Sequence, residues 1–142
     1  MEDRYRAFGQ KFSAAIIAKD DAAVQALLAP WLQVDALREA VDQHVRGMCQ
    51  EWGIDEEIYP TECQLDGNVA IKVEHLREPD WDDSIPEIPE QLTDENFRYW
   101  MSLQFMPAEG AVEFDAFFDL WLAVVEDDGG LRAGYYKFTD PD

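Results

Sequence analysis

One carboxylate interrupts an otherwise apolar segment, residues 117–126. Asp119 stands between Phe118 and Leu120, so its side chain either faces solvent on one side of a sheet or is desolvated with a raised pKa. A desolvated carboxylate would suit a general base that removes a proton from a carbon acid. A packed core, however, prefers the uniformly apolar set Phe118, Leu120 and Leu122. We therefore expect Asp119 to face away from the third predicted helix.

Two tyrosines and a histidine complete the candidate catalytic set. Tyr99 and Tyr135 could donate hydrogen bonds to an oxyanion if they lined a pocket, although aromatic residues on strands usually serve packing. His44 and His75 are the two imidazoles, and neither has a partner nearby in the sequence. The hypothesis of an enzyme therefore depends on Asp119, with Tyr99, Tyr135 or His44 as its partner.

The sequence contains no recognisable metal or cofactor motif. Cys49 and Cys63 form neither a C-x-x-C pair nor a ligand array, so we interpret them as structural thiols. The densest acidic cluster, residues 80–83, lacks the glycine and the terminal glutamate of a calcium loop. No glycine-rich phosphate loop is present either. We expect no cofactor and no metal.

Charge is unevenly distributed along the chain. The formal net charge is −20 over 142 residues. Residues 1–50 hold seven acids and six bases, whereas residues 51–142 hold twenty-four acids and five bases, which gives −1 against −19. Such a field repels phosphate backbones, and nonspecific nucleic-acid affinity comes almost wholly from Lys and Arg. Binding to nucleic acid or to an anionic membrane is therefore not expected.

The acidity has three competing explanations. It can serve solubility, or adaptation to high salt. It can steer the protein toward a basic partner, such as a cationic toxin or a nucleic-acid-binding protein. The acidic residues can also bind divalent cations, but the densest cluster, residues 80–83, lacks features of a calcium loop and gives this explanation little support.

Apolar residues at helical spacing predict three helices before Gly53. The first covers residues 2–19, and the second covers 22–29, between the N-capping pair Asp20-Asp21 and Pro30. The third has an apolar stripe from Val34 to Trp52, and Gly53 stands where a C-terminal cap is expected.

After Gly53 the apolar period changes from about 3.6 to 2, which predicts strands. Residues 59–65 and 68–76 are expected to pair across a turn at Asp66-Gly67. Three prolines among acids make 78–90 an exposed loop. The remaining strands are predicted at 97–106, with bulky residues on both faces, and in a hairpin of 117–126 with 131–138 around the turn 127–130; the tail 139–142 is expected to fray.

Length and composition favour a single α+β domain over residues 1–142. Aromatic residues make up 13% of the chain, so a folded protein is expected. The start of the chain lacks the features of a secretory signal, and no apolar run approaches the ~20 residues that span a bilayer. We expect a cytoplasmic protein.

Three helices followed by antiparallel strands and a Gly-Gly hairpin resemble the nuclear transport factor two-like superfamily of cystatin-like α+β domains. The resemblance is carried by the amphipathic first helix with the following residues 18–28, and by the run 118–125 with its hairpin. It implies three N-terminal helices packed on a curved antiparallel sheet, often with a pocket between them. Its members include ketosteroid isomerases, polyketide cyclases, transport adaptors and toxin-immunity proteins, so it implies fold more than function. The proline-rich segment 78–90 departs from the short connection that the family implies.

Three functional hypotheses follow. The first is a noncatalytic acidic binding module that engages a basic protein partner, as an immunity protein does. The second is a small pocket enzyme of the ketosteroid isomerase or polyketide cyclase type, which would take a small apolar ligand and use Asp119. The third is a homodimer through the exposed sheet face, which the two apolar faces of 97–106 allow. The charge asymmetry favours the first.

Overall fold

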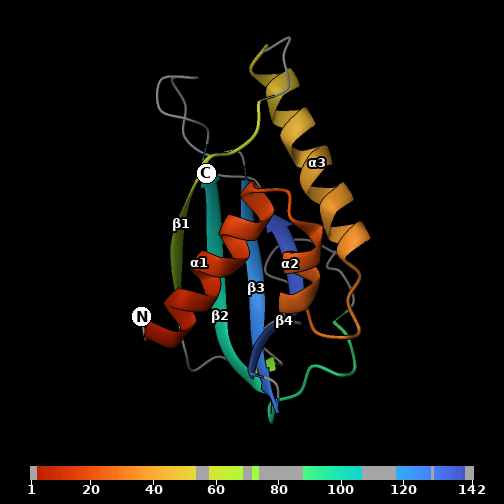
Figure 1. Cartoon of the computed structure of the whole chain (residues 1–142), viewed down its shortest axis with the longest axis vertical. Coiled ribbons are helices and arrows are strands. Elements are labelled where there is room, and N and C mark those ends of the chain that lie inside the picture. Colours follow the sequence, from red (N-terminus) through yellow and green to blue (C-terminus); the bar gives the residue numbers. More distant parts are fainter. Residues whose placement is uncertain are drawn as a thin grey trace.

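The computed structural model describes residues 3–53, 58–68, 72–73, 88–106, 118–128 and 130–139. Three helices precede a four-stranded antiparallel sheet whose strands adjoin in sequence order, as Figure 1 shows. The predicted α+β class and the predicted order of helices before strands are confirmed. The elements are α1 (Asp3–Ile17), α2 (Asp21–Leu27), α3 (Val34–Glu51), β1 (Glu62–Asn68), β2 (Phe97–Met106), β3 (Phe118–Asp127) and β4 (Gly130–Thr139).

Local signals set the ends of the helices. The Asp20 carboxylate accepts a hydrogen bond from the Ala23 amide at 3.1 Å and caps α2, which satisfies one of the amides left open at a helix start. Gly53 follows the C-cap of α3 with φ = 73°, a left-handed conformation that glycine adopts without steric cost. The three predicted helices are confirmed to within about two residues, the usual uncertainty of helix ends.

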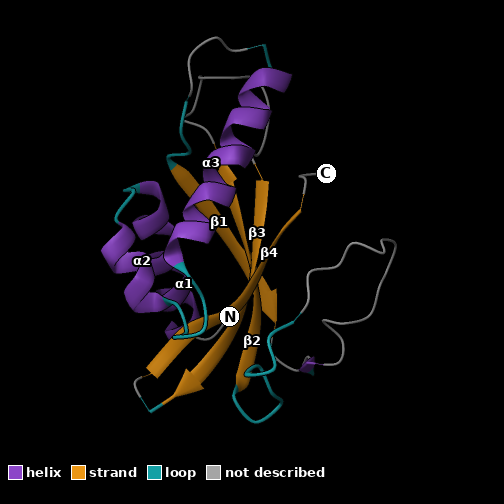
Figure 2. Cartoon of the chain, turned by 90° about the vertical axis from the view of Figure 1, so that its right-hand side faces the viewer, coloured by secondary structure: helices purple, strands orange, loops and turns teal. Residues whose placement is uncertain are grey.

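All three helices lie on one side of the sheet (Figure 2), and α1 contacts β1 and β2. This helix face of the sheet presents large apolar side chains that are almost completely buried. Each such side chain contributes about 1.5–3 kcal/mol on burial. The residues that β2 and β3 contribute to this core are Tyr99, Met101, Leu103, Phe105, Phe118, Leu120, Leu122 and Val124.

The second face of the sheet has its own apolar cluster. Trp100 and Tyr135 are buried there beneath Val73, Ile88 and Leu92, which come from outside the strands. The bulky residues on both faces of 97–106 predict that each face is at least partly covered, and this is confirmed. Because both faces are covered at this end, the strand carries bulky residues at successive positions rather than a simple apolar–polar alternation.

The strands after residue 96 follow the prediction closely. β2 has the predicted bounds, β3 and β4 each differ by one residue at each end, and Asp127 pairs with Gly130 at the hairpin. Phe117 lies outside the described residues. Thr139, assigned to the frayed tail, is instead paired with Asp119 at the end of β4.

The predicted hairpin of 59–65 with 68–76 is wrong. β1 continues through Asp66-Gly67 to Asn68 and pairs with β2. Gly67 is needed for close approach and not for a turn, since an added Cβ would overlap the Tyr99 ring and the Trp100 carbonyl oxygen. Within 69–76 only Lys72 and Val73 are described, and neither is in a strand.

Val73 has a different role from the one predicted. It is buried against the second face of the sheet, and its amide donates to the Asp94 carboxylate at 2.8 Å. Its apolar side chain therefore covers the sheet instead of extending it. The acidic cluster 80–83, His75 and most of the loop 78–90 lie outside the described residues; Ile88 to Glu90 are irregular, as predicted for that loop.

Candidate functional site

Asp119 faces away from the helices. It pairs with Gln104 on β2 and Thr139 on β4, whereas the neighbouring Phe118 ring lies 5.7 Å from the His44 ring of α3. The predicted orientation of Asp119 is therefore confirmed. The residue as a whole is half-buried, and its Oδ1 atom is buried.

Tyr99 and His44 lie on the opposite side of the sheet, Tyr99 in the core between helices and sheet and His44 half-buried on α3. Tyr99 is 2% exposed and stacks on Tyr5 of α1, with ring centroids 4.6 Å apart. The His44 ring lies 4.4 Å from that of Phe138, and its Nδ1 is 3.2 Å from the Ala40 carbonyl oxygen one helical turn earlier. Both side chains pack against aromatic rings on the face of the sheet opposite to Asp119.

Tyr135 shares the second face with Asp119 but is distant from it along the sheet. Burial raises the pKa of the Tyr135 hydroxyl, and the side chain belongs to the cluster around Trp100. Asp119 pairs with Thr139, four residues further along β4, which corresponds to about 14 Å at the rise of an antiparallel strand. The structure thus does not bring the four predicted catalytic residues to one site.

A small cavity lies where the three helices meet. It is lined by Ile16, Val24, Val34 and Leu37 and by the ion pair of Asp21 with Arg38, which is 3.3 Å long. Its volume is about 10 Å³, which is space for about one water molecule. Pockets for small ligands measure about 300–1,000 Å³, so this cavity cannot hold a steroid-sized substrate.

Cys63 of β1 is poorly suited to act as a nucleophile. Burial raises the pKa of its thiol to about 12, a hydrogen bond with Ser13 acts in the opposite direction, and the negative charge of Asp119 raises the pKa further. The thiolate is the reactive form of cysteine, so the raised pKa disfavours reaction of this side chain near neutral pH. This agrees with the prediction of structural thiols; Cys49 is also free and is buried.

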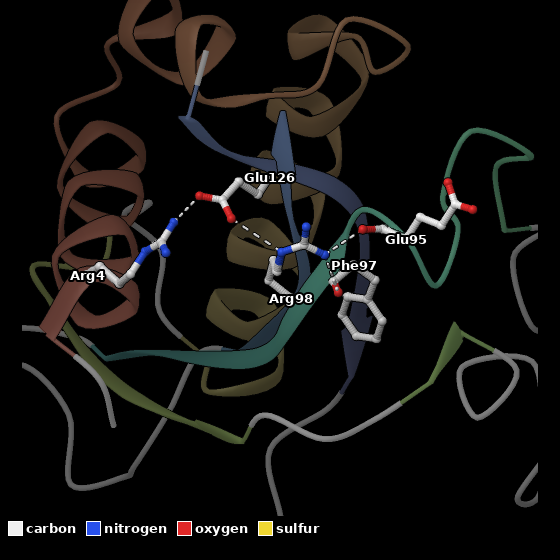
Figure 3. A network of polar contacts seen from close by, with 5 residues as sticks. All are labelled: Arg4, Glu95, Phe97, Arg98 and Glu126. Atoms are coloured by element: carbon white, nitrogen blue, oxygen red, sulfur yellow. Dashed lines mark hydrogen bonds and ion pairs between the residues drawn. The ribbon is translucent and has the colours of Figure 1, made fainter. Parts of the chain in front are cut away.

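An ionic network joins the start of α1 to the sheet (Figure 3). Glu126 of β3 binds Arg4 and also Arg98 of β2, the latter at 3.3 Å. Arg98 additionally donates to the carbonyl oxygens of Glu95 and Phe97, at 2.6 and 3.3 Å. The hydrogen bond from Arg4 is the largest cause that lowers the pKa of Glu126. No sequence signal identifies this network, because its partners are 122 and 28 residues apart.

The second face also carries an aromatic pair that the sequence analysis did not identify. The rings of Trp100 and Trp121 stack at 5.3 Å and 19°. The Lys137 Nζ atom lies 5.9 Å from the Trp100 ring, and the Trp121 indole donates to Thr139 at 3.2 Å. One sequence signal could have predicted this pair. Each of two neighbouring strands carries a tryptophan, and both side chains lie on the same face of the sheet.

Within the described ranges, no group of three or more His, Cys, Asp or Glu side chains is arranged to hold a metal ion. None of the helices in this part of the chain is long and apolar enough to cross a membrane.

Comparison of the chain with family models, with curated proteins and with solved structures gave no match. The resemblance to the nuclear transport factor two-like superfamily therefore stays a prediction.

Proposed function

We propose that this protein is a noncatalytic acidic module that binds a basic protein partner. The observation that carries the proposal is the distribution of its charges: four of the six described arginines are engaged in ion pairs within the molecule, while many acids remain exposed. Arg38 contacts Asp21 and Asp42, and Arg132 contacts Asp127 at 3.3 Å. Arg4 and Arg98 share Glu126.

The acids that remain on the surface outnumber the bases there. Exposed carboxylates occur on helices, strands and loops alike, so the negative field is a property of much of the described surface. Such a field raises the association rate of a basic partner and repels nucleic acid. The exposed acids outside the ion pairs given above are Asp3, Asp20, Asp35, Glu39, Glu51, Glu62, Asp66, Glu90, Asp94, Glu95 and Asp128.

The geometry gives the enzyme hypothesis less support. An isomerase-like mechanism needs a carboxylate and a proton donor that both reach the reacting part of one bound substrate. Asp119 lies on one face of the sheet, while Tyr99 and His44 lie on the other. Two free cysteines are consistent with a reducing compartment such as the cytosol.

The test begins with capture of partners on the immobilised protein, after which each purified partner is measured separately. We expect a partner of basic isoelectric point whose association rate falls more than about tenfold between ~0.05 and ~0.5 M salt, because salt screens steering charges. Duplex DNA and RNA should not bind at physiological salt. A neutral or acidic partner, or an association rate that salt leaves unchanged, would remove the proposal.

A second assay addresses the enzyme directly. Proton exchange on a conjugated ketosteroid is followed with the wild-type protein and with Asp119→Asn, which preserves shape and removes the ionised carboxylate. The proposal predicts no exchange above background in either protein. Exchange by the wild type that is lost in Asp119→Asn would place the enzyme hypothesis first.

A further inference from the structure

The two edge strands of the sheet, β1 and β4, differ in the contacts that their outer sides make with described residues. On β4, Ala133 forms a parallel bridge with Leu28 and its carbonyl oxygen accepts the Ala29 amide at 2.9 Å. The Trp31 indole donates to the Gly134 carbonyl oxygen at 2.8 Å. Residues that follow α2 thus cover this part of the β4 edge.

The opposite edge is formed by β1, and no described residue pairs with its outer side. Figure 1 shows β1 at the margin of the sheet, beyond β2. Its seven residues pair with β2 in one continuous register from Glu62 to Asn68, without a bulge. The strand also contains no proline. Bulges, prolines and lysines are among the usual protections of an exposed edge, together with other charged side chains and cover by a helix or loop. β1 has no bulge, proline or lysine, and its exposed charges are Glu62 and Asp66.

The side chains of β1 divide by face. Leu65 points toward α1, where it lies against Gly9, and Cys63 is near Ser13 of the same helix. The alternate residues Glu62, Gln64 and Asp66 are exposed, so they lie on the face away from the helices. Among the described residues, this face of β1 therefore carries two exposed carboxylates, those of Glu62 and Asp66.

These two carboxylates indicate which kind of strand could pair with the outer edge of β1: a second copy of the chain or a basic segment of another protein. If a second copy of the chain paired antiparallel about Gln64, Glu62 of each copy would lie opposite Asp66 of the other. Like charges directly across a strand pair destabilise it, and a net charge of −20 on each copy adds repulsion at long range. A strand that carries lysine or arginine would instead be attracted at the same positions.

We propose that β1 is the docking strand of this protein, and that an extended basic segment of the partner adds to the sheet at its outer edge. Main-chain hydrogen bonds to β1 supply affinity, and basic side chains opposite Glu62 and Asp66 select the partner. Because these acids are four residues apart on one face, the segment carries its basic residues at the same spacing. This inference rests on the proposed function and names its binding surface.

The probe is a synthetic peptide about as long as the seven residues of β1, with alternating lysine and valine. A second peptide has the same sequence with every backbone nitrogen methylated, which keeps the charge but removes the main-chain donors. Binding to the full chain is followed by amide chemical shifts and by hydrogen exchange. We expect the first peptide to protect amides of β1 and leave Ala133 and Gly134 of β4 unchanged, and the methylated peptide to protect neither.

Two charge-matched double variants locate the site. Glu62→Lys with Asp66→Lys should weaken binding of the first peptide by more than about tenfold. Glu39→Lys with Glu51→Lys makes the same change of charge on exposed positions of α3 and should change affinity by less than about twofold, because neither residue lies on β1. Near-ultraviolet circular dichroism verifies that both variants are folded.

The outcomes separate this inference from the proposed function. Salt-dependent binding that protects other residues, that tolerates methylation, or that responds equally to both double variants would overturn docking at β1 and leave an acidic binding module standing. Absence of peptide binding at low salt would overturn docking at β1, and the proposed function would then depend on its own test with purified partners.

Discussion

Gly9 and Gly47 both lie inside helices, but their surroundings differ. An alanine Cβ at Gly47 of α3 would have no heavy atom within 4 Å. At Gly9 of α1 the same Cβ would overlap the Leu65 Cδ2 and Met101 Sδ atoms, and Met101 is completely buried. The same substitution therefore tests packing at one position and leaves it untouched at the other.

The expected free energies follow from two terms. Replacement of glycine by alanine inside a helix stabilises by about 1 kcal/mol, and this term is shared by both variants. Overpacking in a filled core costs about 1–3 kcal/mol, and it applies to Gly9→Ala alone. We expect Gly47→Ala to stabilise by about 1 kcal/mol and Gly9→Ala to destabilise by about 0–2 kcal/mol, so that the difference between the variants is the packing term.

Urea unfolding followed by tryptophan fluorescence measures both variants against the wild type. Equal slopes with shifted midpoints would show that stability changed and the unfolding transition did not. If Gly9→Ala stabilised the protein as much as Gly47→Ala does, the close contact of α1 with β1 and β2 at Gly9 would be refuted.

Three further predictions concern single groups. Asp20→Ala should destabilise by about 1 kcal/mol through loss of the α2 cap, while Asp20→Asn should stay within a few tenths because it preserves the acceptor; equal losses in urea unfolding would contradict the cap. The folded-state pKa of Glu126 is lowered from 4.5, so its stabilisation is complete above that pH and is lost as pH falls through the folded value; Glu126→Gln should flatten the fall of the urea midpoint in this range, and an unchanged pH profile would disprove the network. With a thiol pKa of about 12, Cys63 in a Cys49→Ala variant should react with iodoacetamide at pH ~8 at least about a hundredfold more slowly when folded than in urea; comparable rates would show an accessible thiolate.

Local physics explains which parts of the fold the sequence predicts. Helices 3–17, 21–27 and 34–51 each carry an apolar face and an end signal within a few residues of one another, so neighbouring residues suffice to locate them. The strand 97–106 and the two strands of the final hairpin are each ten residues long and rich in apolar and aromatic residues, and turn residues separate the last two. These elements were predicted with nearly correct bounds.

β1 shows where local reasoning fails. Asp66-Gly67 has the composition of a hairpin turn, yet the reason for Gly67 is the Tyr99 ring on β2, thirty-two residues later. Val73 likewise alternates with polar neighbours as a strand residue would, while its burial comes from the cluster on the second face. In both cases the deciding contact is remote in the sequence, so no pattern within a short window contains it.

The positions of the candidate site residues also depend on contacts remote in the sequence, except for the orientation of Asp119. The facing of Asp119 was predictable because the period of a strand is 2 and one of its two residue sets was uniformly apolar. The sequence could not predict whether any of three side chains lies near Asp119, namely those of Tyr99, Tyr135 and His44. Their positions depend on the register of three strands and on the position of α3. Two clusters that contain aromatic residues lie on opposite faces of the sheet. Tyr99 packs in one cluster and Tyr135 packs in the other. The remaining chemistry of the described surface is its charge, and two exposed carboxylates lie on β1, whose outer edge no described residue pairs with.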